Sequence, residues 1–162
     1  MTPTDIVVTF ASALGGALVG AYMSYLLARR QEIHRARTER TLRLLEQYNS
    51  PELLQARGDA GRILRTYFET HAERSWNDLY RDLKDEYTPI SVVEHFFQQV
   101  LFFHECREID DDVAQKFFAH EYEHWYNNYF GKISTAAIQK GESGDKSTTT
   151  RLFQWLGSNE QL

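Results

Sequence analysis

The chain has 162 residues, of which 42% are apolar and 14% aromatic, and it carries a formal net charge of −5. This length allows one modest domain plus an anchor, and the apolar content allows that domain a core of its own. The single cysteine, Cys106, excludes an internal disulfide and agrees with a reducing compartment.

The charges are unevenly distributed along the chain. Residues 29–43 hold six arginines against two glutamates, whereas residues 44–162 hold 12 basic and 20 acidic side chains. An acidic domain repels phosphate backbones, so we expect no nucleic acid among its partners. No segment of the sequence has the pattern of a β-strand or of an internal repeat, which predicts an all-α protein.

Residues 6–28 form an uncharged stretch of 23 residues directly before the arginines. At about 1.5 Å per residue, a helix of this length spans roughly 30 Å of hydrocarbon. The N-terminal sequence Met-Thr-Pro-Thr-Asp lacks the basic residues of a signal peptide, which favours a retained transmembrane helix. Because basic residues stay on the cytoplasmic side, we expect a bacterial inner-membrane protein with its N-terminus outside and residues 29–162 in the cytoplasm.

Small residues recur within this predicted span. Ser12, Gly16, Gly20 and Ser24 follow one another every four residues and therefore share a helix face. Small side chains let two helix backbones approach closely in lipid, so this face predicts association with a second copy or with another membrane protein. The alternative explanation is that glycine and alanine are simply frequent in membrane helices.

The arginines after the predicted span have two compatible interpretations. Arg29, Arg30 and Arg35 lie closest to the span and are predicted to bind anionic lipid headgroups. The other interpretation is that the arginines only determine topology. Arg40 and Arg43 lie further along the same helix, where screening leaves little attraction to lipid.

The sequence predicts four parts in chain order. Because residues 29–49 contain no glycine or proline, we expect the membrane helix to continue to about Tyr48. The predicted parts are an N-terminal transmembrane anchor (1–28), an arginine-rich juxtamembrane helix (29–49), a helical bundle domain (50–139), and a flexible linker with a short apolar C-terminal helix (140–162).

Ser50 and Pro51 mark the start of the first helix of the bundle. Serine caps helix starts, and proline fits the first turn because its missing N–H is not needed there. We expect this helix to cover residues 51–71. Gly58 and Gly61 inside it lower helix stability and therefore indicate a close crossing with another helix.

Two further helices have similar start signals. Ser75 opens an amphipathic helix over residues 75–85, and Thr88, followed by Pro89, is the predicted cap of a helix over residues 88–106. The apolar residues of this second helix cover more than one face. A helix of this kind is expected at the centre of a bundle.

The last long helix is predicted over residues 111–139, after a cap at Asp110. Residues 141–150 are rich in Gly, Ser and Thr, which predicts a flexible linker. Residues 151–156 are short and apolar, and we expect them to dock on the parent bundle or on a neighbouring subunit, because exposed Phe and Trp are unfavourable. The buried stripe of the long helix is predicted to be Ala114, Phe118, Tyr122, Trp125 and Tyr129.

The order of these elements, with "TLRLLEQYNSPELLQAR" and "REIDDDV" as its landmarks, resembles a widespread bacterial family of small membrane-anchored proteins. The likeness covers about residues 6–132, and "NSPE" is its most specific part. It implies a single-span anchor with a cytoplasmic antiparallel helical bundle and brings no established activity. In architecture alone, the chain is also similar to single-span CRISPR-associated accessory proteins, which form membrane pores in antiphage defence.

Residues 120–124 read His-Glu-Tyr-Glu-His, a spacing that brings two histidines to one helix face for zinc binding. A third ligand would come from His104 or Cys106 on the preceding helix. The acidic residue before the second histidine and the missing sheet disfavour a zinc hydrolase. The structural alternative is that His120 and His124 form hydrogen bonds at the edge of the aromatic face.

Arg65 and His71 resemble the arginine-to-histidine spacing of HEPN-type ribonucleases at these two positions. In that chemistry the histidine transfers protons and the arginine holds the phosphate. The acidic domain opposes RNA binding, and such a spacing arises often by chance. We therefore expect no catalytic residue, no metal and no cofactor.

These patterns favour a non-enzymatic, membrane-anchored helical protein that acts through assembly. It would be a homo-oligomer or an accessory subunit of a larger membrane complex. Two alternatives stay open. The first is an antiphage membrane effector or pore with a degenerate HEPN-like domain. The second is a HEPN-type ribonuclease or a zinc-binding helical domain.

Overall fold

The computed structural model describes the backbone of residues 3–71, 73–142 and 146–157, and within these ranges the side chains from residue 17 onward except 146 and 147. Every regular element in this part of the chain is a helix, and none is a strand. The all-α prediction is therefore confirmed. The chain divides into two compact units, Met1–Arg37 and Thr38–Leu162.

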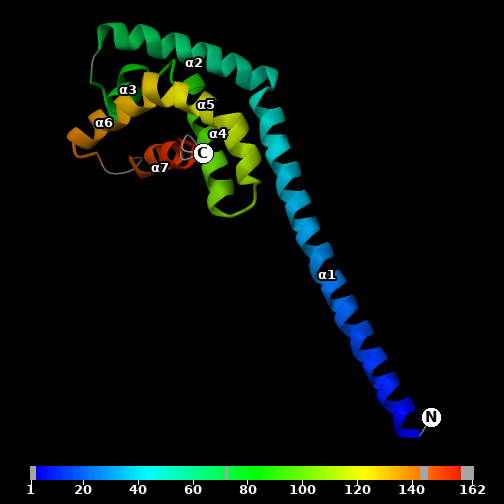
Figure 1. Cartoon of the computed structure of the whole chain (residues 1–162). Coiled ribbons are helices and arrows are strands. Elements are labelled where there is room, and N and C mark those ends of the chain that lie inside the picture. The colour runs from blue at the N-terminus through cyan, green and yellow to red at the C-terminus, as the bar shows by residue number, and fades with distance from the viewer. Residues whose placement is uncertain (1–2, 72, 143–145, 158–162) are drawn as a thin grey trace. The chain divides into compact units, whose positions relative to one another are not determined.

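The helices are labelled in chain order in Figure 1. Helices α2 and α4 begin at the predicted residue and end within one residue of the prediction, whereas α3 is shorter than predicted. The bounds are α1 Pro3–Tyr48, α2 Pro51–Thr70, α3 Trp76–Asp82, α4 Thr88–Glu105, α5 Asp111–Trp125, the π-helix η1 Tyr126–Phe130, α6 Gly131–Gln139 and α7 Lys146–Gly157.

Three of the four predicted helix caps are present. Ser50 and Asp110 each accept a backbone N–H three residues further on, at 3.2 and 3.3 Å, and Ser75 forms a capping box with Asp78. The predicted cap at Thr88 is wrong, because Thr88 is already the first residue of α4 and the residue before it makes no side-chain cap bond. The N-terminal proline signal alone marks this start.

The helix predicted over residues 111–139 is present as α5, η1 and α6, with a π-helical turn at η1. The buried positions Trp125 and Phe130 are five residues apart, Tyr129 between them is buried as well, and Ile133 continues the buried stripe. A π-turn accommodates such a spacing while keeping the following helix turned toward the core. The prediction of a helix over these residues is therefore confirmed, and the π-turn at η1, where Tyr129 and Phe130 are both buried, was not predicted.

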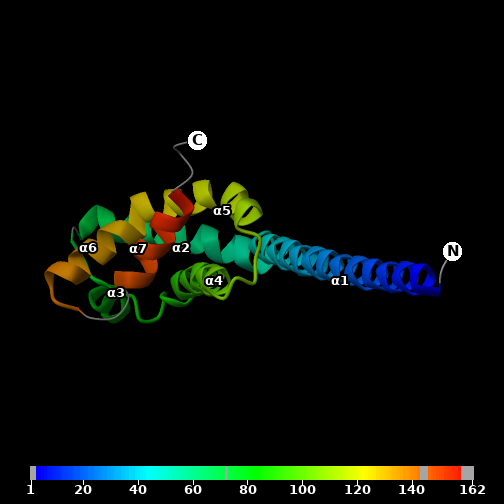
Figure 2. The same cartoon turned by 60° about the horizontal axis from the view of Figure 1, so that its bottom comes forward.

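The core of the second unit is aromatic. The ring of Tyr48, at the end of α1, lies 5.2 Å from Phe96, 6.1 Å from Phe97 and 5.7 Å from Phe118, measured between ring centroids. Aromatic pairs at such distances contribute about 1 kcal/mol each beyond their buried area. Helix α4, which carries two of these rings, contacts both α2 and α7 (Figure 2), in agreement with apolar residues on more than one face, although Val92 and Phe102 are exposed.

The last turns of α1 are fixed to the acidic turn before α5. The Thr38 hydroxyl donates to the Asp110 carboxylate at 3.0 Å, and the Thr41 hydroxyl accepts the Asp110 N–H at 2.9 Å. Arg40 forms an ion pair with Glu108. The turn "REIDDD" therefore does more than reverse the chain, because it also holds the end of α1 against the bundle.

One of the two glycines of α2 packs against another helix. A Cβ added to Gly61 would lie 4.0 Å from the Trp125 ring, and the Tyr129 hydroxyl donates to the Gly61 carbonyl at 3.4 Å. A Cβ on Gly58 would meet nothing within 4 Å. The prediction of a close crossing is therefore wrong for Gly58, and at Gly61 the contact is an ordinary van der Waals one.

Helix α7 begins five residues before the predicted apolar segment. Residues 143–145 of the predicted linker lie outside the described residues. Leu152 and Leu156 are buried, which confirms the docking of this segment in its intramolecular form. Its other contacts are the ring stacks Phe153–Tyr126 and Trp155–His104, the hydrogen bonds from Gln115 to the Trp155 carbonyl and from Tyr122 to the Thr149 carbonyl, and the Arg151–Glu105 ion pair.

Within the described residues, no helix combines the length and the apolar character that a membrane crossing requires. The span predicted from the sequence covers residues 6–28. The side chains of residues 6–16 lie outside the described residues, so the span stays a prediction.

Candidate functional site

The first unit exposes large apolar side chains on α1. On a helical wheel, the large side chains between Leu18 and Leu27 leave a sector of about 160° that contains Gly20 and Ser24. Ser12 and Gly16, the other two residues of the predicted interface, lie outside the described side chains. The exposed large apolar residues of this unit are Leu18, Val19, Tyr22, Met23, Tyr25, Leu27 and Ile33.

The predicted headgroup ligands follow directly on the same helix. Arg29, Arg30 and Arg35 are all exposed, in the first unit. Arg40 differs from them, because its guanidinium pairs with Glu108 in the second unit. Arg40 is exposed as well, but its charge is already paired, whereas Arg29, Arg30 and Arg35 are the exposed arginines next to the predicted span.

Arg65 and His71 do not form a joint site in the described residues. Arg65 is exposed on α2. The Nδ1 atom of His71 lies 2.8 Å from the Thr70 hydroxyl and 3.2 Å from the Tyr67 carbonyl oxygen, and its ring stacks on the Tyr67 ring at 4.6 Å. The imidazole is thus engaged by its own helix turn.

The predicted zinc ligands are also dispersed. His120 and His124 are exposed on α5, where the His124 ring contacts the Asn128 amide at 3.2 Å. His104 contacts Asp111 at 2.8 Å and stacks on a tryptophan of α7, and Cys106 is exposed. No group of three or more His, Cys, Asp or Glu side chains in the described part of the chain is arranged to hold a metal ion.

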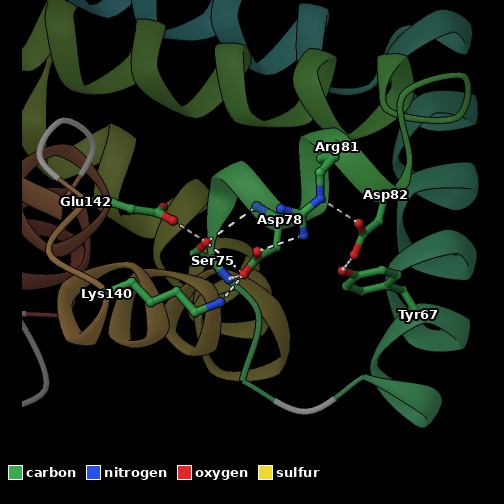
Figure 3. A network of polar contacts seen from close by, with 7 residues as sticks. All are labelled: Tyr67, Ser75, Asp78, Arg81, Asp82, Lys140 and Glu142. Atoms are coloured by element: carbon green, nitrogen blue, oxygen red, sulfur yellow. Dashed lines mark hydrogen bonds and ion pairs between the residues drawn. The ribbon is translucent and has the colours of Figure 1, made fainter.

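Asp78 is the centre of a polar network between α3 and the end of α6 (Figure 3). Its carboxylate accepts the N–H and the hydroxyl of Ser75 at 3.1 and 2.9 Å, pairs with Arg81 at 3.0 Å, and also pairs with Lys140. The hydrogen bond from Lys140 is the main reason that the pKa of Asp78 lies well below its usual range. We call this group the Asp78 network.

The Asp78 network joins α3 to the end of α6, and its serine is inaccessible to substrates. The Ser75 hydroxyl lies 2.9 Å from Asp78 and 2.5 Å from Glu142, so two carboxylates share its single proton. Ser75 has no exposed surface, which prevents its hydroxyl from acting as a nucleophile on a substrate. The Ser-x-x-Asp spacing indicates the capping box in the sequence, but no sequence signal indicates Lys140 or Glu142.

A second cluster joins α1, α2 and α5, and the sequence analysis did not find it. The Tyr48 hydroxyl donates to Glu121 at 2.7 Å, and the Arg57 guanidinium lies 3.7 Å from the Tyr48 ring centroid. Burial, followed by the bond to Glu121, raises the pKa of Tyr48 to about 12. The Nε atom of Arg57 is buried without a hydrogen-bond partner among the described residues.

A groove of about 580 Å³ lies beside η1. We call it the η1 groove. Phe68 of α2, Glu73 of the segment before α3, and Tyr126, Gly131 and Lys132 are among the residues that line it. Its lining combines aromatic rings with charged side chains of both signs.

The chain matches no family model, no curated protein and no solved structure.

Proposed function

We propose that this protein is a membrane-anchored helical assembly protein. Residues 6–28 anchor it in a bacterial inner membrane with the N-terminus outside, and the second unit lies in the cytoplasm. The span associates with a second copy or with a subunit of a larger membrane complex. The chain acts by bringing partners together and not by catalysis.

One observation carries this proposal. Helix α1 exposes large apolar side chains over most of its circumference between Leu18 and Leu27, which is costly in water. Lipid covers such a surface, and a sector of small residues lets a second helix approach. The exposed Arg29 and Arg30 follow at once, where anionic headgroups and the cytoplasmic side would lie.

The interface is tested by measuring the oligomer mass of the detergent-solubilised chain with multi-angle light scattering. Gly20→Leu and Gly16→Leu place a bulky side chain on the small face, and we expect the assembly to dissociate. Tyr22→Leu places the same residue on the opposite sector and is expected to leave the mass unchanged.

Two results of the mass measurement would count against this interface. An unchanged mass in both glycine variants would mean that the small face is not the contact. A monomeric wild type would exclude the homo-oligomer and leave a different membrane protein as partner, to be identified by co-purification from native membranes.

The orientation is tested by reporter fusions at the C-terminus. We expect a cytoplasmic fluorescent reporter to be active there and a periplasmic phosphatase to be inactive. Replacing Arg29, Arg30 and Arg35 by glutamine should increase the inverted fraction. Phosphatase activity in the unaltered chain would contradict the proposed topology.

A further inference from the structure

The η1 groove is built around a glycine at an irregular helix turn. A Cβ on Gly131 would lie 2.9 Å from the Tyr126 carbonyl oxygen and 3.0 Å from its ring, so a larger residue needs a backbone shift. π-turns are rare in helices and occur frequently at functional sites. The wall of this groove is therefore formed by a backbone feature that often accompanies binding.

Glu73 and Lys132 bring opposite charges to the η1 groove from different elements. Neither Glu73, in the segment before α3, nor Lys132, on α6, has an ion pair or hydrogen bond with any described residue. Glu73 also has a φ angle of 58°, in the left-handed region that is unfavourable for a non-glycine residue. The chain thus keeps a strained backbone at an unpaired carboxylate beside an aromatic surface.

We propose that the η1 groove binds a small aromatic zwitterion, the chemical class of a free aromatic amino acid. A volume of about 580 Å³ lies within the range of small-molecule sites. The ligand's ammonium group pairs with Glu73, its carboxylate pairs with Lys132, and its ring lies against Phe68. A ligand with one charge would leave the other groove charge unpaired. This site is independent of the assembly proposed above.

The test uses three probes that share an indole ring and differ in charge: L-tryptophan, tryptamine and indole-3-propionate. Each is titrated into the intact chain in detergent micelles and followed by isothermal calorimetry and saturation-transfer NMR. We expect L-tryptophan to bind about tenfold more tightly than either singly charged probe, because it makes both ion pairs. Equal affinities for the three probes, or no binding of L-tryptophan, would overturn the proposal.

Variants that each remove one charge then test which ligand group pairs with Glu73 and which pairs with Lys132. Glu73→Gln should weaken L-tryptophan and tryptamine about tenfold and leave indole-3-propionate unchanged, and Lys132→Gln should weaken L-tryptophan and indole-3-propionate instead. Glu46→Gln and Lys116→Gln make the same changes at exposed positions outside the groove and should alter nothing. Circular dichroism confirms that each variant is folded. Affinities that do not follow this pattern would show that the two charges do not hold the ligand.

Discussion

At the scale of single residues, Asp78 joins α3 to the end of α6 through charge-assisted hydrogen bonds. This carboxylate is buried and accepts hydrogen bonds from the cap residue Ser75, from Arg81 and from Lys140, which lies 62 positions away in sequence. Such a group stabilises the fold only while it is ionised. The stability that Asp78 contributes should therefore depend on pH.

Asp78→Asn should destabilise the second unit by about 2 kcal/mol at neutral pH, because the charge-assisted bonds and part of the cap are lost. The folded-state pKa of Asp78 is lowered, so the contribution is complete above the ordinary pKa of 3.8 and is lost as the pH falls below it. Urea unfolding of both proteins between pH 7 and about pH 2 measures this. A difference that stayed constant down to the acid end would contradict the role of ionisation.

A second titration concerns Tyr48. Burial raises its pKa to about 12 in the folded state, against about 10 in an unfolded chain. The stabilisation is therefore complete below pH 10 and is lost as the pH rises through the folded pKa. Tyr48→Phe should reduce the alkaline loss of stability, measured by urea unfolding at pH 8 and 11. An identical alkaline slope in the variant would assign the effect elsewhere, with Tyr67 as the next candidate.

At the scale of elements, helix starts could be predicted from the sequence because they depend on local chemistry. Each cap side chain accepts a backbone N–H group three residues further along, as at Ser50, Ser75 and Asp110. The capping residue and the residue that it caps therefore lie in one short stretch of sequence. The π-turn was missed because Trp125 and Tyr129 keep the four-residue spacing of a regular helix and give no signal for it.

Two glycines in helices should respond in opposite ways to alanine. Gly131→Ala places a Cβ 2.9 Å from a backbone oxygen and should lower stability by about 1–3 kcal/mol. Gly58→Ala meets open space inside α2 and should raise stability by up to about 1 kcal/mol. Thermal melts followed by circular dichroism compare the two. Equal gains would show that η1 relaxes freely around the new methyl group.

At the scale of the whole molecule, the sequence predicted the helical class and the apolar character of α4, because periodicity and composition report burial. It could not predict which distant side chains meet. The ion pair of Asp78 with Lys140 and the η1 groove both depend on tertiary packing of α2, α3 and α6.

The second unit should need the end of α1 but not its beginning. Leu44 and Tyr48 are 3% and 4% exposed, and losing both leaves a cavity among the rings of α4 and α5. A chain shortened to begin at Thr38 is expected to melt cooperatively, whereas one that begins at Pro51 is expected to lose the cooperative transition. Thermal melts followed by circular dichroism test this prediction. A cooperative melt of the chain that begins at Pro51 would contradict it.

Helix α1 is continuous from Pro3 to Tyr48, yet its two parts should differ in how long their amide protons persist in D₂O. Between residues 17 and 36 its side chains are mostly exposed, and a helix without packing opens readily in water. From Thr38 onward, the buried positions tie its opening to that of the bundle. The amide exchange times should therefore rise abruptly near Thr38. Transfer of the chain into lipid bilayers should lengthen the exchange times of the residues before Thr38 and leave those after it unchanged.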